Sequence, residues 1–148
     1  TQLKRMSEIL STDLTNVDIS RPLLKPGPIE FEVSDVRVEK TKKDKKVVTI
    51  KLKTLFEQKS IKVGETLKPG FGLTHSIYID PTEKYTEERI QQELKKFRQG
   101  VTGDPTGTFV PVDQYISRHV IGNVIIESDE TGEYPDKNRI TSFTHVKA

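Results

Sequence analysis

Residues 28–53 read PIEFEVSDVRVEKTKKDKKVVTIKLK, and this stretch decides the fold that we expect. Apolar residues occupy every second position from 29 to 33, which is the pattern of a half-buried β-strand. After Ser34 and Asp35 the apolar residues move to positions 36 and 38, so the alternation slips by one residue. A strand keeps one face buried across such a slip only if it contains a bulge or a sharp bend. Small closed barrels need a first strand of this kind, because it must pair with both halves of the barrel.

The second half of the same stretch predicts a β-hairpin with a strongly basic tip. Residues 40–46 form a polar turn, and residues 47–53 alternate again, with Val48, Ile50 and Leu52 facing inward. From position 37 to position 53 there are eight basic and two acidic residues, a net charge of +6 in a chain whose total is +2. A polyanion would feel this local field rather than the small charge of the whole chain.

The rest of the sequence predicts three further strands and one helix. The strands are expected at 73–79, 118–127 and 139–146. The helix is expected to start after Thr86, a good N-cap residue, and to end at Gly100 or Gly103. Gly122, inside the second of these three strands, indicates a bend or bulge.

Three strands, one helix and then two strands is the element order of an oligonucleotide/oligosaccharide-binding (OB) barrel. We therefore expect a mainly β protein, a five-stranded OB-fold barrel over residues 28–148 with a helix between strands 3 and 4. Residues 1–27 are expected to form an extended N-terminal arm, because polar residues and then prolines at 22, 26 and 28 follow a short helix over 3–10. A parallel α/β fold would need more crossover helices, and a β-sandwich usually needs about seven strands.

Composition excludes several classes of protein. The chain has 148 residues, of which 32% are hydrophobic and 31% are charged, so one domain with a small core is expected. It has no cysteine, which excludes disulfide scaffolds, thiol catalysis and cysteine-ligated zinc, and fits a reducing cytoplasm. No apolar run approaches the roughly 18 residues that span a bilayer, and the start does not resemble a signal peptide, so no membrane partner is expected.

Known catalytic motifs are absent from the sequence. It contains no phosphate-binding loop, no dinucleotide-binding glycine pattern, no zinc-protease helix motif and no serine-hydrolase elbow. The histidines His75, His119 and His145 stand far apart in three predicted strands, and His75 has the parity of a core-edge residue. We therefore expect no enzyme, no cofactor and no metal site.

The basic hairpin is the strongest functional signal in the sequence. Lysines at a hairpin tip can follow a flexible phosphate backbone, and exposed aromatic rings stack on single-stranded bases at roughly 1–3 kcal/mol per base. Tyr78 has the parity to face outward beside the lysines of the second strand. The predicted nucleic-acid-binding residues are Arg37, Lys40, Lys42, Lys43, Lys45, Lys46, Lys51, Lys53, Phe56, Phe71, Tyr78, Tyr134, Lys137 and Arg139.

Structural roles compete with these assignments. A lysine-rich turn is often only a solvated loop, and lysines at sheet edges also deter aggregation. Phe56 and Phe71 suit a core as well as a stacking platform, and Tyr78 suits cross-strand packing as well as base stacking. The strand order, the +6 hairpin and the outward tyrosine together favour binding over these alternatives.

Several short motifs point to one family. They are GPIEFEV at 27–33, EKTKK at 39–43, Phe97 near the end of a helix, IG at 121–122 and NRI at 138–140. On these motifs, the sequence from residue 26 onward resembles phage-encoded OB-fold proteins that bind single-stranded DNA in replication and recombination. The resemblance implies single-stranded DNA as the ligand, replication or recombination proteins as further partners and the host cytoplasm as the location. The chain lacks tryptophan and ends in THVKA instead of a long acidic tail, so recruitment of partners through such a tail is not expected.

A second hypothesis comes from a different class of function. It is a structural or protein-interaction β-barrel of a phage assembly, in which the proline-rich arm docks on a neighbour and nucleic acid is not bound. This hypothesis predicts self-association that is insensitive to salt and no shift of labelled oligonucleotides. A small hydrolase with a His/Asp metal site is a third and more distant hypothesis. The choice between DNA and RNA, the footprint and any homo-oligomeric state stay open.

Overall fold

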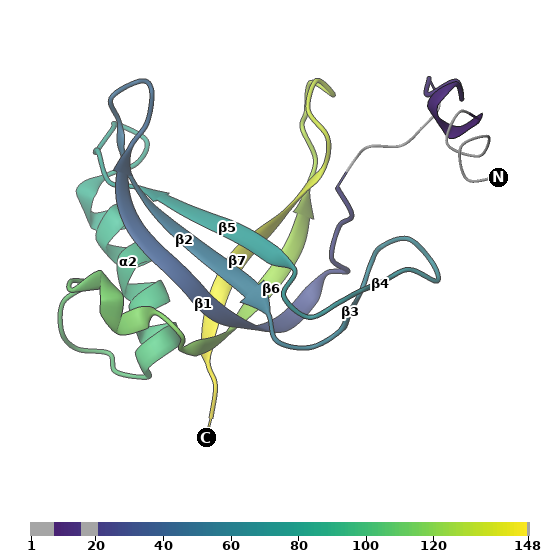
Figure 1. Cartoon of the computed structure of the whole chain (residues 1–148). Helices are drawn as coiled ribbons and strands as arrows, with labels where there is room; N and C mark the ends of the chain where they lie inside the picture. The colour runs from purple at the N-terminus through teal and green to yellow at the C-terminus, as the bar shows by residue number, and fades with distance from the viewer. Residues whose placement is uncertain (1–7, 16–20, 148) are drawn as a thin grey trace.

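The computed structural model describes residues 8–15 and 21–147. Its main element is a five-stranded antiparallel sheet in the order β5-β2-β1-β6-β7 (Figure 1). The strands are β1 (Gly27–Lys40), β2 (Lys46–Thr54), β5 (Gly72–Tyr78), β6 (His119–Glu127) and β7 (Lys137–His145). The other elements are the short strands β3 (Gln58–Lys59) and β4 (Thr66–Leu67), helix α2 (Glu87–Thr102) and the 3-10 helix η1 (Val112–Tyr115). The predicted mainly β architecture, with a helix between the third and fourth long strands, is confirmed.

The first strand bends and pairs with both halves of the sheet. β1 pairs with β2 over residues 31–40 and with β6 over residues 27–32. The register of the β1–β2 pair shifts between Val33 and Asp35, which is the bulge that the slipped alternation predicts. Val33 and Val36 are therefore both buried, although residues three positions apart in a regular strand would point to opposite faces.

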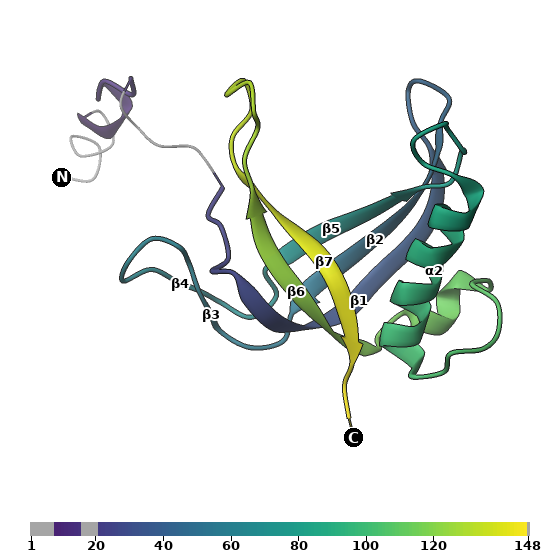
Figure 2. The same cartoon turned by 180° about the vertical axis from the view of Figure 1, so that it is seen from behind.

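The sheet does not close into the barrel that the sequence predicts. β5 and β7 are its two edges, and no hydrogen-bonded pairing joins them over the part of the chain that the structure describes. In Figures 1 and 2 the two strands separate toward the β1–β2 and β6–β7 loops, which rise at the same end of the molecule. α2 packs mainly against β7 and lies beside this opening. The fold is thus an open, strongly curved sheet with a helix along one edge.

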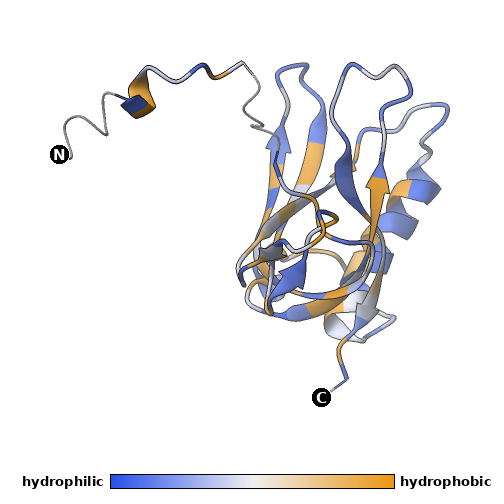
Figure 3. Ribbon diagram, turned by 90° about the vertical axis from the view of Figure 1, so that its right-hand side faces the viewer, coloured by the Kyte–Doolittle hydropathy of each residue, from blue (hydrophilic) through white to orange (hydrophobic). Residues whose placement is uncertain are grey.

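The inward faces of the strands and α2 enclose the core. Hydrophobic and hydrophilic residues alternate along the strands (Figure 3). Phe97 of α2 lies in an aromatic cluster, with its ring centroid 5.2 Å from that of Phe143 and 5.3 Å from that of Tyr115. Phe31 and Phe97 are fully buried, and Phe143 packs against the core while partly buried, so all three belong to the interior of the fold.

The ends of α2 lie where the sequence places them. Thr86 Oγ1 accepts a hydrogen bond from the Arg89 backbone N–H at 3.3 Å. At the other end, the Gly103 N–H donates to the Gln99 carbonyl oxygen at 2.8 Å. Gly103 has φ = 74°, a left-handed conformation that favours glycine because glycine has no Cβ atom. Tyr85 directly precedes the N-cap Thr86, and its backbone N–H donates to Thr82 Oγ1 at 3.0 Å. Among the described residues, no helix is both long enough and apolar enough to cross a bilayer.

The last part of the predicted arm packs onto the sheet domain. Leu24 is fully buried, and the Asn138 side chain of β7 binds both its N–H (2.8 Å) and its carbonyl oxygen (3.0 Å). Residues 23–25 also bond to residues 59–61 beside β3, and the sequence predicts neither this contact nor β3, β4 and η1. Of the helix expected over 3–10, residues 8–10 are helical, and residues 1–7 lie outside the described part of the chain.

Candidate nucleic-acid interface

A tight loop joins β1 to β2 and carries the predicted lysine cluster. The Thr41 N–H donates to the Lys45 carbonyl oxygen at 2.8 Å, and the Asp44 N–H donates to the Thr41 carbonyl oxygen at 2.9 Å. Asp44 has φ = 60°, a left-handed conformation that aspartate adopts more readily than most residues. Because backbone bonds hold the loop, its lysine side chains are not needed for its shape and are exposed to solvent.

The end of β5 lies beside this loop and supplies a tyrosine. The Ile79 N–H donates to the Lys46 carbonyl oxygen at 3.1 Å, and Asp80 Oδ2 accepts a hydrogen bond from the Lys46 N–H at 2.7 Å. These two bonds fix Tyr78 next to the hairpin tip, where 48% of its surface is exposed.

A pocket of about 660 Å³, here called the tip pocket, lies between the hairpin tip and the loop before α2. Its lining residues are Thr41, Lys42, Lys43, Lys45, Tyr78, Asp80, Thr82 and Tyr85. Three of the predicted lysines and the predicted tyrosine therefore meet in one place. A flat ring and three cations in one pocket offer both a stacking surface and a site for anions.

The lysines of the tip are free to bind an anion. Among the described residues, the ammonium groups of Lys42, Lys43, Lys45 and Lys46 take part in no ion pair. Lys40 Nζ lies 3.7 Å from the Asp44 carboxylate, in an exposed pair that contributes little. Residues 40–46 carry a net charge of +4. A phosphate chain can bind here without first breaking an internal ion pair.

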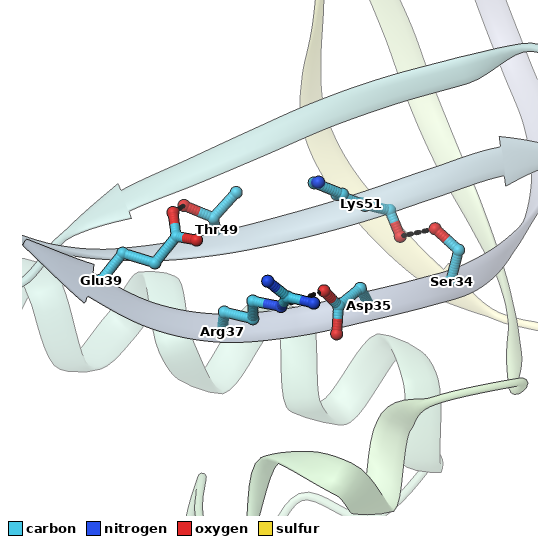
Figure 4. Close-up of polar contacts among 6 residues, drawn as sticks. All are labelled: Ser34, Asp35, Arg37, Glu39, Thr49 and Lys51. Atoms are coloured by element: carbon cyan, nitrogen blue, oxygen red, sulfur yellow. Dashed lines mark hydrogen bonds and ion pairs between the residues drawn. The ribbon is translucent and has the colours of Figure 1, made fainter.

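The cations on the outer face of the sheet are balanced by acids of β1. Arg37 Nε lies 2.5 Å from Asp35 Oδ2, and Lys53 Nζ lies 3.6 Å from Glu32 Oε2. Figure 4 shows Arg37 and Asp35 side by side on β1, with Lys51 on the neighbouring strand. This face is therefore a mixed-charge surface, on which Arg37 and Lys53, both predicted to bind nucleic acid, are already paired with acids.

Lys51 and Tyr78 share the outer face of the sheet, as the parity predicts, but lie far apart on it. Lys51 pairs with Thr74, and Tyr78 pairs with Val47. The four residue steps from Thr74 to Tyr78 span about 13 Å of extended strand. The lysines of the tip loop, and not those of the sheet face, line the pocket that holds the tyrosine.

A second group of predicted residues meets near the start of β5. A pocket of about 720 Å³, here called the arm pocket, is lined in part by Phe71, Tyr134 and Lys137. The Arg21 guanidinium lies 4.6 Å from the centre of the Phe71 ring, so it already occupies one face of that ring. Tyr134, in the β6–β7 loop, is 71% exposed and offers the more open ring.

The remaining predicted residues lie around these two pockets. Lys137 Nζ and Arg139 Nη1 lie 3.6 Å and 2.8 Å from the Glu127 carboxylate. The hydrogen bond from Arg139 lowers the pKa of Glu127, so this carboxylate is ionised at neutral pH. Phe56 follows β2 with its side chain exposed, and it lines neither the tip pocket nor the arm pocket. Half of the predicted residues thus meet in the two pockets, and the others line neither of them: Arg37, Lys40, Lys46, Lys51, Lys53, Phe56 and Arg139.

Tyr85 lines the tip pocket, with Arg89 beside it, although neither residue is among those predicted from the sequence. The Arg89 guanidinium lies 5.6 Å from the centre of the Tyr85 ring. Burial raises the pKa of Tyr85, and the Glu93 carboxylate raises it further, so the phenol stays neutral at physiological pH. The sequence feature that could have identified Tyr85 is its position directly before the N-cap Thr86, which places it in the loop that leads into α2.

Comparisons with known proteins assign no family to the chain. No family model matches it, and no curated protein sequence matches it either. Among the described residues, no group of three or more His, Cys, Asp or Glu side chains is placed to hold a metal ion. The functional inference therefore rests on the geometry of the pockets.

Proposed function

We propose that this protein binds single-stranded nucleic acid, with the tip pocket as its primary site. The observation that carries the proposal is that the half-exposed ring of Tyr78 shares one pocket with Lys42, Lys43 and Lys45. Lysines neutralise phosphates and an exposed ring stacks on a base, so together they match the repeating unit of a nucleotide chain. Neither contact reads the edge of a base, so the binding is largely independent of sequence.

A single strand fits this site better than a duplex. Tyr78 can stack only on a base whose face is free, and base pairs in a duplex cover one another. The family resemblance of the sequence favours DNA as the ligand and a role in phage replication or recombination. The cations and aromatic rings gathered in the tip pocket support a binding role.

We also propose that the sheet is an OB-fold whose barrel is left open. In chain order the long strands are β1, β2, β5, β6 and β7, with α2 between the third and the fourth. The first strand pairs with the second and the fourth, which is the connectivity of that fold. In OB-folds the ligand binds near the loops that join strands 1 to 2 and 4 to 5, which here carry the tip lysines and Tyr134.

Fluorescence anisotropy with a labelled oligothymidylate and a duplex of the same length tests the proposal. The variant Lys42→Glu/Lys43→Glu/Lys45→Glu should bind the single strand at least about tenfold more weakly than the wild-type protein. The matched control is Lys59→Glu/Lys62→Glu/Lys68→Glu, which changes the same charge at exposed lysines outside the pocket. The control should keep most of the affinity. Thermal unfolding of both variants shows whether they fold.

Tyr78→Leu separates stacking from charge. This variant keeps an apolar side chain opposite Val47 but removes the ring, and it should lose about 1–3 kcal/mol of binding free energy. Equal affinities of the tip variant and the control variant would refute the site. Absence of any oligonucleotide binding by the wild-type protein would refute the function.

The N-terminal arm favours protein interaction as a second candidate function. Ile9, Leu10 and Leu14 are large apolar side chains that the structure leaves exposed. Such side chains gain free energy when a partner covers them. This function predicts a complex that persists at high salt, needs no oligonucleotide and is lost when residues 1–20 are deleted. Light scattering of the full chain and of the truncated chain at two salt concentrations distinguishes it from nucleic-acid binding.

A further inference from the structure

The opening between β5 and β7 exposes one face of helix α2. In a closed barrel, main-chain hydrogen bonds between these strands would occupy this place, but here the sheet order leaves both edges unpaired. A pocket of about 580 Å³ lies in the opening, here called the seam pocket. Tyr85, Arg89 and Lys96 line it from the helix and the loop before it, and Lys137 and Arg139 line it from β7.

The seam pocket joins the two pockets described above. It shares Tyr78 and Tyr85 with the tip pocket, and it shares Thr74, Lys137 and Asn138 with the arm pocket. Because neighbouring pockets have lining residues in common, the three pockets adjoin one another. The row of pockets runs from the hairpin tip along the seam of the sheet to the start of β5.

The charges in the seam pocket favour an anion. Four cationic side chains and the two carboxylates of Glu93 and Glu127 line it, a net charge of +2. Lys96 lies 3.2 Å from Glu93, and Lys137 and Arg139 both contact Glu127, so these cations are partly neutralised. Arg89 takes part in no ion pair among the described residues and lies over the ring of Tyr85. Its guanidinium is the cation of the seam that is most available to a phosphate.

We propose that the bound strand continues from the tip pocket along the seam, with α2 as the floor of its path. This inference rests on the proposed function. Arg89 and Lys96 contact phosphates from the helix, and Tyr134 stacks a base at the far end. The outer face of β1 and β2, where Asp35 and Glu32 balance the cations, lies outside the path. The helix is thus a binding element because the barrel is open beside it.

Oligonucleotide length tests this path. A short strand of about 4 nucleotides fills only the tip pocket, whereas one of about 15 nucleotides also enters the seam. In Arg89→Gln/Lys96→Gln, the slope of log Kd against log salt should fall by about 1.4 for the long strand, because two phosphate contacts are lost. The slope for the short strand should be unchanged. The matched control, Lys62→Gln/Lys95→Gln, removes the same charge at exposed sites outside the three pockets.

Each outcome of this experiment has a distinct meaning. If the wild-type protein binds but the seam variant matches the control on both strands, the seam path is wrong and the tip site stands. If the seam variant weakens both strands equally, the path is also wrong, since the substitutions then act on the tip pocket. If the wild-type protein binds neither strand, the proposed function and the path fail together. Thermal unfolding of the seam variant confirms that its fold is intact.

Discussion

Gly100 of α2 lies directly against Phe143 of β7, because a Cβ atom at position 100 would come within 2.5 Å of the Phe143 Cβ. The close approach lets the helix settle onto the edge strand and brings Phe97 into edge-to-face contact with the Phe143 ring. The position of α2 beside the seam therefore depends on a residue without a side chain.

Gly100→Ala should destabilise the protein although it raises helix propensity. Alanine gains about 0.5–1 kcal/mol over glycine inside a helix, but overpacking a tight contact costs about 1–3 kcal/mol, so the free energy of unfolding should fall by about 1–2 kcal/mol. Urea denaturation measures the change. Gln92→Ala, at an exposed position of the same helix, should shift the free energy by less than about 0.5 kcal/mol. Equal stability of the two variants would show that α2 can move away from β7 at little cost.

Leu24→Ala should destabilise the protein strongly although Leu24 precedes the first strand. The side chain is fully buried, and truncating a buried leucine typically costs about 2–5 kcal/mol. Urea denaturation should therefore give a clearly lower midpoint. Leu10→Ala, in the exposed part of the arm, is the control and should change the midpoint little. A Leu24 variant as stable as the Leu10 variant would mean that residues 21–26 do not belong to the folded domain.

His75 should make the protein less stable at mildly acidic pH. Burial lowers the pKa of His75 below 6.5, with a smaller opposing effect from Glu93 and a further lowering by Arg139. The unfolded chain therefore takes up a proton more readily than the folded protein as the pH falls below 6.5, and this uptake favours unfolding. Above that range both states hold a neutral imidazole, so this contribution vanishes.

The matched variant for this effect is His75→Phe, which keeps a ring beside Phe143 but cannot titrate. Melting temperatures of the two proteins, measured between about pH 7.5 and about pH 5.5, should diverge, with the wild-type protein losing more stability. Parallel curves for the two proteins would contradict the predicted role of His75.

The salt dependence of binding should reveal how many tip lysines contact phosphates. Each contact to a single strand contributes about 0.7 to the slope of log Kd against log salt, so Lys42→Gln/Lys43→Gln/Lys45→Gln should lower the slope by about 2. Anisotropy titrations of one oligothymidylate over several salt concentrations measure this slope. An unchanged slope with weaker binding would indicate that the lysines shape the loop and do not touch phosphates.

Local patterns in the sequence predict the strands and the helix well, because each element carries its own signal. The slip of alternation at Ser34 and Asp35 predicts the bulge, and the Thr86 cap predicts the start of α2. The parity of Tyr78 predicts its outward position, but the sequence places it beside the lysines of the second strand, whereas in the structure it lies beside the tip lysines because it pairs with Val47 at the start of β2.

Local sequence patterns do not predict contacts between segments that are far apart in the chain. In the sequence, Leu24 belongs to a proline-rich arm. In the structure, the side chain of Asn138, more than a hundred positions later, binds its backbone and holds it on the sheet domain. The charge balance of the outer face is also missed, because counting charges from position 37 leaves out Asp35 and Glu32, which pair with Arg37 and Lys53. The openness of the barrel depends on how far β5 and β7 curve toward each other, a property of the whole sheet.

The bulge in β1 makes the length of this strand as important as its composition. Removing Ser34 would place Phe31, Val33 and Val36 on one face of a regular strand, so β1 would lose the bulge at which its pairing with β2 shifts register. Related sequences should therefore tolerate exchanges within this strand much better than insertions or deletions there, whereas the loop at 41–45 can vary in length without disturbing the interior.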